Sequence, residues 1–184
     1  MAKVLVPLAN GFEDIEAITI IDVLRRGAIE VVTASIHEQL EVKSTHGIAM
    51  KADALFSAVG DDEYDAIVLP GGGEGTENLR NCDSLIARLR RQDEEGRLLC
   101  AICAAPIVLC EVGLDPAIQM TCYPTCQMEL DRPWVPSPVV TCGNIITGQA
   151  PGSAMLFALV VLQTLAGEVV SHKVARGMVT DVLE

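Results

Sequence analysis

Aromatic residues are scarce in this sequence, and their scarcity narrows the choice of fold. Phe, Trp and Tyr make up 3% of the 184 residues, although hydrophobic residues make up 50%. The core must therefore consist of aliphatic side chains and alanine, a composition typical of a parallel sheet covered by helices. A chain of this length fills one core well, so we expect a single domain over residues 1–184.

Long hydrophobic runs and targeting signals are also missing. The longest uncharged apolar stretch, residues 154–162, is about half as long as the ~20 residues that cross a bilayer. The N-terminus has neither the apolar segment of a secretory signal nor the Arg-rich pattern of a transit peptide. We therefore expect a buried helix at 154–162, a cytoplasmic location and no membrane partner.

Positive charge is in short supply. The chain has 13 Lys and Arg residues against 25 Asp and Glu residues, which gives a net charge of -12. A surface this acidic repels phosphate backbones, so we expect no nucleic-acid partner.

Cysteine is plentiful, but a disulfide framework is absent. The seven cysteines are odd in number and follow no framework spacing, which indicates reduced thiols. The spacings Cys100-x-x-Cys103 and Cys122-x-x-x-Cys126 leave open a zinc site or a redox dithiol. We expect Cys100 to lie within a strand, whereas a redox pair sits together at a helix start. No metal or other cofactor is therefore expected.

Short apolar runs alternate with helix-length segments along the chain, and no repeat or linker interrupts them. Strands are predicted at 3–8, 29–35, 66–69, 98–102, 119–121, 139–142 and 145–147, with a small hairpin over 40–50. Helices are predicted over 13–26, from about 76, and over 84–95, 104–112, 154–165 (with Ser153 as N-cap) and 168–183. The alternation predicts an α/β fold with a doubly wound, mostly parallel sheet that has helices on both faces. The loops 9–16, 70–75 and 103–106 should then converge at the carboxyl edge of the sheet.

Cys103 lies where a buried strand gives way to a helix. The residues two before and two after it, Ala101 and Ala105, are small, as the crowded turn of a nucleophile elbow requires. Backbone N–H groups at a helix start favour the thiolate, which is the reactive form. The alternative is one more inert, buried cysteine.

The glycine-rich run 70–75 follows the third core strand. It lacks the Lys-Ser/Thr of a phosphate-binding loop and the spacing of a dinucleotide fingerprint. Its backbone N–H groups could instead form an oxyanion hole with that of Ala104, and we choose Gly72 as the second donor. The alternative is a tight turn with no further role.

Glu16 shares a helix face with Ile20 and, nearly, with Val23, so it should point inward. A buried carboxyl group beside a thiol would raise the pKa of both groups, and the arrangement is consistent if Glu16 is protonated and donates a hydrogen bond. The alternative is an acid exposed to water at the helix start.

Four motifs occur in order along nearly the whole chain: N-G-F-E-D-I-E-A at 10–17, L-P-G-G-G-E-G-T-E-N-L at 69–79, A-I-C-A-A-P at 101–106 and G-Q-A-P-G-S-A at 148–154. Together they resemble the ThiJ/PfpI superfamily, in the branch of the DJ-1-like and YajL-like proteins. The resemblance implies a flavodoxin-like homodimer with an oxidation-prone cysteine at a nucleophile elbow.

Site residues follow from the same resemblance. It implies that Cys103 is the nucleophile, Glu16 its protonated partner, and Gly72 and Ala104 the oxyanion donors. Gly71, Ala105 and Tyr123 are expected to line the substrate pocket.

Activity also follows from the resemblance. It implies glyoxalase or deglycase-type chemistry, without cofactor, on methylglyoxal, glyoxal or glycated adducts. The alternative is a redox sensor or chaperone in which Cys103 is oxidised to the sulfinate.

The sequence departs from the family at two positions. Tyr123 stands where animal members have a histidine before a proline, and His46 stands where the branch often has an arginine. The residue directly after the cysteine is Ala104 rather than the histidine of related proteases, so we do not expect triad hydrolysis.

Overall fold

The computed structural model describes residues 1–59 and 62–180. Its main sheet contains β1 (Lys3–Leu8), β2 (Glu30–Ser35), β5 (Ala54–Leu55), β6 (Ala66–Leu69), β7 (Leu98–Ile102), β8 (Val139–Cys142) and β9 (Ile145–Gly148). The strand order is β5-β2-β1-β6-β7-β9-β8, and the pairs are parallel except β8 with β9. The five central strands have the flavodoxin-like 2-1-3-4-5 order, which confirms the predicted fold class.

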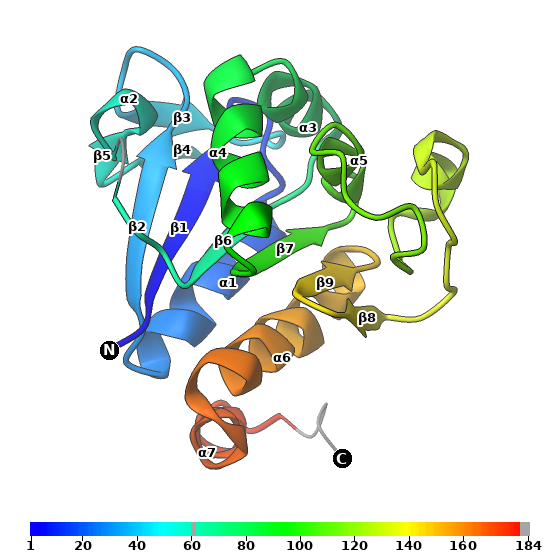
Figure 1. Ribbon diagram of the computed structural model, residues 1–184. Helices are drawn as coiled ribbons and strands as arrows, with labels where there is room; N and C mark the ends of the chain where they lie inside the picture. Colours follow the sequence, from blue (N-terminus) through cyan, green and yellow to red (C-terminus); the bar gives the residue numbers. More distant parts are fainter. Residues whose placement is uncertain (60–61, 181–184) are drawn as a thin grey trace.

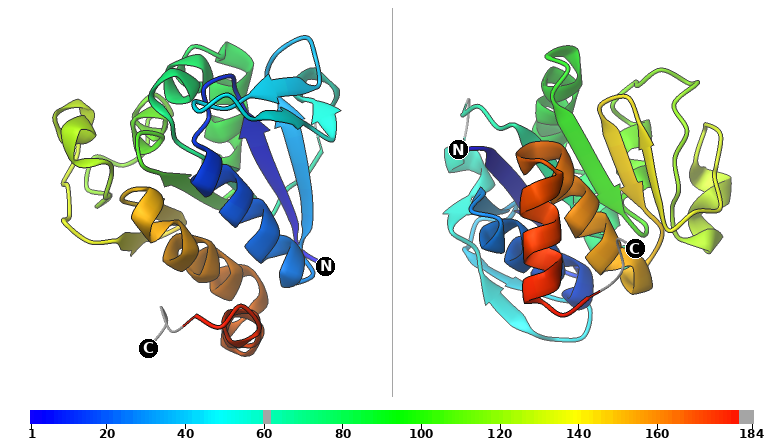
Figure 2. Two further views of the ribbon diagram at one scale, coloured as in Figure 1. Left: turned by 180° about the vertical axis from the view of Figure 1, so that it is seen from behind. Right: turned by 90° about the horizontal axis from the view of Figure 1, so that it is seen from below.

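Helices cover both faces of this sheet. They are α1 (Asp14–Arg26), α2 (Phe56–Val59), α3 (Gly73–Arg80), α4 (Asp83–Glu94), α5 (Pro106–Cys110), α6 (Ala154–Ala166) and α7 (Glu168–Gly177), with short 3₁₀ turns at Pro124–Glu129 and Pro151–Ser153. Figure 1 shows α4 in front of the sheet, and the view from behind in Figure 2 shows α1, α6 and α7 on the opposite face. None of the helices in residues 1–59 and 62–180 is both long and apolar enough to cross a bilayer.

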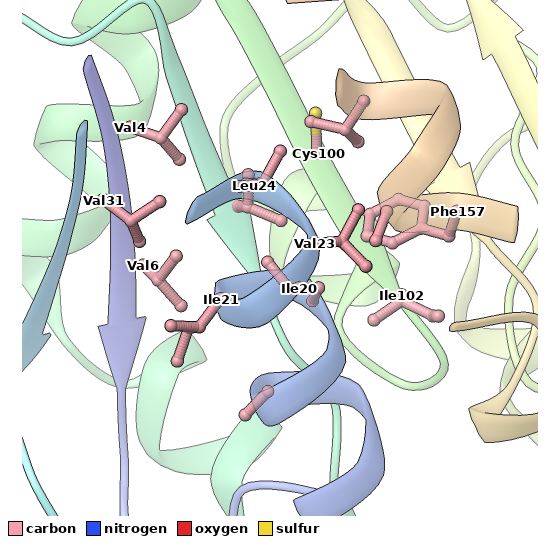
Figure 3. Packing of buried hydrophobic residues seen from close by; sticks show 14 of the residues in the cluster. Val4, Val6, Ile20, Ile21, Val23, Leu24, Val31, Cys100, Ile102 and Phe157 are labelled. Carbon is pink, nitrogen blue, oxygen red and sulfur yellow. The ribbon is translucent and has the colours of Figure 1, made fainter. Parts of the chain in front are cut away.

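Two aliphatic clusters fill the space between the sheet and its helices. Successive residues of a strand point to opposite faces, so Val4 and Val6 pack with α1 and α6, whereas Leu5 packs with the α3–α5 side. Figure 3 shows the first cluster, in which α1 lies over the sheet and Phe157 of α6 packs nearby. Phe157 is one of the few aromatic side chains in the core, as the composition predicts.

Several predicted boundaries were wrong. The segment 119–121 makes only an isolated bridge between Met120 and Trp134, because the facing residues include Pro133 and Pro136, which have no N–H to donate. Helix α3 begins at Gly73 instead of Thr76, since the Thr76 N–H already donates to the Gly72 carbonyl at 2.8 Å.

Two other helices are shorter than predicted. α5 spans Pro106–Cys110 instead of 104–112, because the residues at both ends form i→i+3 turns, such as Ile107 to Ala104 and Val112 to Leu109. α7 ends at Gly177, beyond which Val179 has φ 55°. The predicted end of this helix, 181–183, lies outside the described residues.

Ser153 precedes α6 as predicted, but its hydroxyl does not cap that helix. The oxygen accepts the N–H groups of Gln149 and Ala150 and donates to the Ala150 carbonyl at 2.9 Å. Ser153 therefore closes the turn before the helix. The hairpin of β3 (Glu41–Lys43) and β4 (Ala49–Lys51) is antiparallel, as predicted, and forms its own small sheet.

Candidate active site at the Cys103 elbow

The three predicted loops meet at the carboxyl edge of the central strands. The loop after β1 and the loop after β6 are joined by hydrogen bonds from Glu13 N–H to the Gly71 carbonyl (2.9 Å) and from Gly75 N–H to the Gly11 carbonyl (3.1 Å). A Cβ atom placed on Gly71 would lie 2.7 Å from the Cβ of Cys103 and 2.7 Å from Oε2 of Glu16. Gly71 thus lets the cysteine and the glutamate approach each other across its empty side-chain position.

Cys103 adopts the strained backbone of a nucleophile elbow. Its φ is 64°, in the left-handed region, which costs a residue with a Cβ about 1–2 kcal/mol. The backbone is held there by a hydrogen bond from its N–H to the Gly148 carbonyl (3.0 Å) and by one from the Tyr123 N–H to its own carbonyl (2.7 Å). The sulfur sits where β7 ends, in a side chain that is 8% exposed.

Glu16 points inward from the first turn of α1, as the helix pattern predicts. Its side chain is fully buried, and Oε2 accepts the Gly71 N–H at 2.8 Å. The backbone N–H of Glu16 is capped by the Glu13 carboxylate, also at 2.8 Å. Because the side chain is fully buried, the alternative of a water-exposed acid was wrong. The other carboxyl oxygen, Oε1, has no hydrogen-bond partner within the described part of the chain.

Burial dominates the electrostatics of this pair. It raises the pKa of Glu16 to about 7, against the opposing effects of the Gly71 N–H and the Cys103 thiol. Burial, followed by the charge of Glu16, also raises the pKa of the Cys103 thiol. Both directions match the prediction for a carboxyl group beside a thiol.

Two backbone N–H groups act in the opposite direction on the sulfur. Hydrogen bonds from Ala104 and Gly72 lower the pKa of Cys103, but by less than burial and Glu16 raise it. The expected bias toward the thiolate is therefore present but outweighed. Gly72 has φ 96°, and a Cβ there would lie 2.2 Å from the Gly11 carbonyl oxygen, so the donor position requires glycine.

The predicted pocket residues separate into two kinds. Gly71 lies between the side chains of Cys103 and Glu16, and Tyr123, 41% exposed, is joined to the elbow by the hydrogen bond from its N–H to the Cys103 carbonyl. Ala105, by contrast, is fully buried in the α3–α5 cluster. Its small size serves the packing of the turn, and the structure does not place its side chain at an accessible surface.

A charged group beside the elbow was not predicted. Within the described residues, Glu13, Asp14 and His46 are the group whose ligand atoms lie close enough to share a metal ion. His46 Nδ1 lies 2.6 Å from Asp14 Oδ2. The hairpin loop thereby docks on the start of α1. His46 replaces the arginine of the branch, as noted from the sequence. Its contact with Asp14 could not be predicted there, because the two residues are 32 positions apart in the chain.

The other noted cysteines are part of the packing. Cys100 is fully buried in the middle of β7, as predicted, and burial raises the pKa of its thiol. Cys122 and Cys126 pack against the α3–α5 cluster, and the Cys122 thiol donates to the Tyr123 carbonyl at 3.4 Å.

The geometry of the site agrees with comparisons to known proteins. The model of the DJ-1/PfpI family matches residues 2–164. This chain belongs to the DJ-1/PfpI family. It is 42% identical to protein DJ-1 homolog B of Arabidopsis thaliana over 90% of its length, and it spans 39% of that longer relative.

Two further family members are similar over most of their lengths. Glutathione-independent glyoxalase DJR-1.2 of Caenorhabditis elegans is 33% identical, with 90% of this chain and 89% of that protein covered. The structure of oxidized Toxoplasma gondii DJ-1 superimposes with a TM-score of 0.95 at 37% identity, covering 98% of this chain and all of that one. The chain therefore has the fold of this DJ-1 structure over nearly all of its residues.

Proposed function

We propose that this protein converts small 2-oxoaldehydes, such as methylglyoxal or glyoxal, into 2-hydroxy acids without an added cofactor. The observation that carries the proposal is the buried Cys103–Glu16 pair, in which both pKa values are raised and two N–H groups face the sulfur. A family member 33% identical to the chain is named a glutathione-independent glyoxalase, which supports the same reaction. Glycated adducts of such aldehydes would be substrates of the same kind.

The chemistry requires one proton to move between Cys103, Glu16 and the substrate. Glu16, with a pKa of about 7, accepts the thiol proton as the sulfur adds to the aldehyde carbon. The oxygen of that carbon becomes negative beside the N–H groups of Gly72 and Ala104, and it is then protonated by Glu16.

The remaining steps complete an internal redox change. Glu16 removes the hydrogen of the former aldehyde carbon as a proton and returns a proton to the neighbouring carbonyl carbon, while the hydroxyl proton on the oxygen of the first carbon passes to the oxygen of the second. The first carbon is thereby oxidised to a thioester and the second is reduced to an alcohol. Water then cleaves the thioester and releases the 2-hydroxy acid and the free thiol, so the net reaction is the addition of one water molecule.

Production of lactate from methylglyoxal by the purified protein tests this proposal. We expect lactate from the wild type and none above background from Cys103→Ser or Glu16→Gln. Cys82→Ser, which removes a thiol on the α3–α4 side, is the matched control and should retain full activity. Equal lactate formation by wild type and Cys103→Ser would exclude the mechanism.

A second candidate function is sensing of oxidants through Cys103. The relative of known structure named oxidized DJ-1 favours this alternative, in which peroxide converts the thiol to the sulfinate. Intact-mass analysis after mild peroxide should show two added oxygen atoms that are lost in Cys103→Ser. Modification spread over several of the seven cysteines would contradict selective sensing.

We also propose that the protein is a homodimer in the cytoplasm. Ile15 and Ile18 on α1 and Ile48 in the hairpin are more than half exposed, and the His46–Asp14 contact holds the hairpin against the start of α1. Exposed apolar side chains on segments that contact each other are typical of an interface between subunits. The seven cysteines are all free thiols in the structure, as a reducing compartment favours.

A further inference from the structure

Glu13 is a buried carboxylate that the proposed reaction does not use. The residue is 8% exposed. It stands directly before α1, and its Oε2 accepts the backbone N–H of Glu16 at 2.8 Å. None of the ion pairs formed among residues 1–59 and 62–180 includes Glu13. A buried charge without a counter-ion is costly, so its place beside the reactive pair calls for a role.

The start of α1 has the form of an opened capping box. In a closed box, the carboxyl group of the third helical residue bonds back to the N–H of the cap residue. Glu16 is the third helical residue, but its Oε2 accepts the Gly71 N–H at 2.8 Å, and the Glu13 N–H donates to the Gly71 carbonyl at 2.9 Å. Gly71 thus takes both groups that would close the box. The Glu16 carboxyl group is therefore free to face Cys103 instead of its own helix.

Three hydrogen bonds join Glu13, Glu16 and Gly71 in a closed circuit. The Glu13 N–H donates to Gly71, the Gly71 N–H donates to Glu16, and the Glu16 N–H donates to the Glu13 carboxylate. A substitution at position 13 can remove the last of these bonds while Glu16 and the backbone of Gly71 stay unchanged. The contribution of Glu13 can therefore be measured separately.

The charge of Glu13 acts on the same carboxyl group. Burial is the largest cause of the raised pKa of Glu16, and the charge of Glu13 acts in the same direction. Cys103 faces Glu16 from the elbow, whereas α6, which packs on α1, has no charged residue. On the hairpin side, His46 Nδ1 engages Asp14 at 2.6 Å, and the ligand atoms of both residues lie within 4.8 Å of that of Glu13. Glu13 is thus the carboxylate whose charge reaches Glu16.

We propose that Glu13 is a positioning residue for the reaction at Cys103: it holds Glu16 beside the thiol through the circuit with Gly71, and its negative charge favours the protonated form of Glu16. A general acid–base group works best when it gains and loses its proton near the operating pH. The charge of Glu13 moves Glu16 toward that condition. This role rests on the proposed function, in which Glu16 exchanges a proton with Cys103.

Glu13→Gln tests the proposal, because it keeps an oxygen for the Glu16 N–H and removes the charge. Carbon-13 NMR of the full chain, assigned with Glu16→Gln, follows the titration of the Glu16 carboxyl group. Its midpoint should be lower in Glu13→Gln than in the wild type by about half a pH unit or more. The acid limb of the pH profile of kcat/KM for lactate formation reports ionisation in the free enzyme, and it should move by the same amount. His46 is present in both proteins, so the difference between them is due to Glu13.

Three further variants separate the charge from the fold. Glu74→Gln makes the same change in an exposed side chain beside the loop 9–16 and should leave the Glu16 titration where it is. Glu13→Asp keeps both the charge and a capping oxygen, so its midpoint should stay close to that of the wild type. Glu13→Ala removes both, and its melting temperature should fall below that of Glu13→Gln. If Glu13→Gln does not fold, Glu13→Asp and Glu13→Ala provide the same comparison of charge.

The outcomes that contradict the proposal are distinct. An unchanged Glu16 titration in Glu13→Gln would reduce Glu13 to a helix cap. An equal shift in Glu74→Gln would indicate an effect of overall charge rather than of Glu13. A lowered midpoint in a protein that forms no lactate would overturn the proposed reaction while supporting the control of Glu16 by Glu13.

Discussion

Glu16 makes the stability of the folded protein depend on pH in an accessible range, because its pKa is raised to about 7. A carboxyl group whose pKa is raised by folding binds its proton more tightly in the folded state than in the unfolded state. Folding stability is then lost as pH rises between the two pKa values. For Glu16 this window runs from its ordinary 4.5 to about 7.

The variant Glu16→Gln should remove this pH dependence. Glutamine keeps an oxygen for the Gly71 N–H but has no proton to lose, so the variant should be more stable than the wild type by about 3 kcal/mol at pH 8. At pH 4 the two should be nearly equal. Urea unfolding at pH 4, 6 and 8 measures the difference, and a constant difference across these pH values would contradict the raised pKa.

Gly71 and Gly73 form a matched pair for the geometry of the elbow. Alanine at 71 places its Cβ 2.7 Å from Cys103 and Glu16, whereas alanine at 73 meets nothing within 4 Å. We expect Gly71→Ala to lose about 1–3 kcal/mol of stability together with lactate formation. Gly73→Ala should keep both, and equal behaviour of the two variants would argue against close packing at position 71.

The site was only partly predictable from single residues. The helix pattern favoured an inward Glu16 and the strand-to-helix transition favoured an elbow at Cys103. These local signals left an exposed acid and an inert cysteine open, and the family resemblance decided between them. The backbone of Cys103 is also held by hydrogen bonds with Gly148, 45 positions away, and with Tyr123, 20 positions away. No local sequence pattern predicts contacts over such separations.

Helices and strands differ in how well the sequence predicts them. Long elements with clear periodicity, such as α1, α4 and β7, were predicted to within about two residues of their structural bounds. The elements β5 and α2 were missed because Ala54–Leu55 and Phe56–Val59 are too short to show a period. Prolines in 131–138 turned a predicted strand near Met120 into an isolated bridge.

The end of α1 packs tightly on α6, and Gly27 allows this approach. A Cβ at 27 would lie 2.2 Å from Cδ1 of Leu162, which is fully buried. Gly27→Ala should therefore cost about 1–3 kcal/mol. In a Leu162→Ala background the same change should cost nearly nothing, because the clashing atoms are gone. Additive losses in this double-mutant cycle, measured by denaturation, would exclude the contact.

At the scale of the whole molecule, family membership rests on the match of the DJ-1/PfpI family model to residues 2–164, which agrees with the resemblance seen in the four motifs. Family membership does not locate the interface of the proposed dimer. The position of a second subunit is inferred from exposed apolar side chains. Ile18 of α1 is 51% exposed and Val169 of α7 is 81% exposed, and these two residues provide a test and a control.

Light scattering after size exclusion should report a dimer for the wild type. Ile18→Arg introduces a charge into the Ile15–Ile18–Ile48 surface and should give a monomer. Val169→Arg adds the same charge on another helix and should leave the dimer intact. A monomeric wild type, or a dimer that survives Ile18→Arg, would exclude this interface.

The hydrogen bond from the Cys103 N–H to Gly148 has a consequence for synthesis on the ribosome. Glu16, Gly71 and Cys103 have all been made once the first 103 residues exist, yet the elbow still lacks the strand that holds it. β9 pairs with β7 only after residue 148 has left the ribosome. Until then the Cys103 thiol belongs to a chain whose sheet ends at β7, so the elbow is completed late in synthesis, by a strand that follows Cys103 by more than 40 residues.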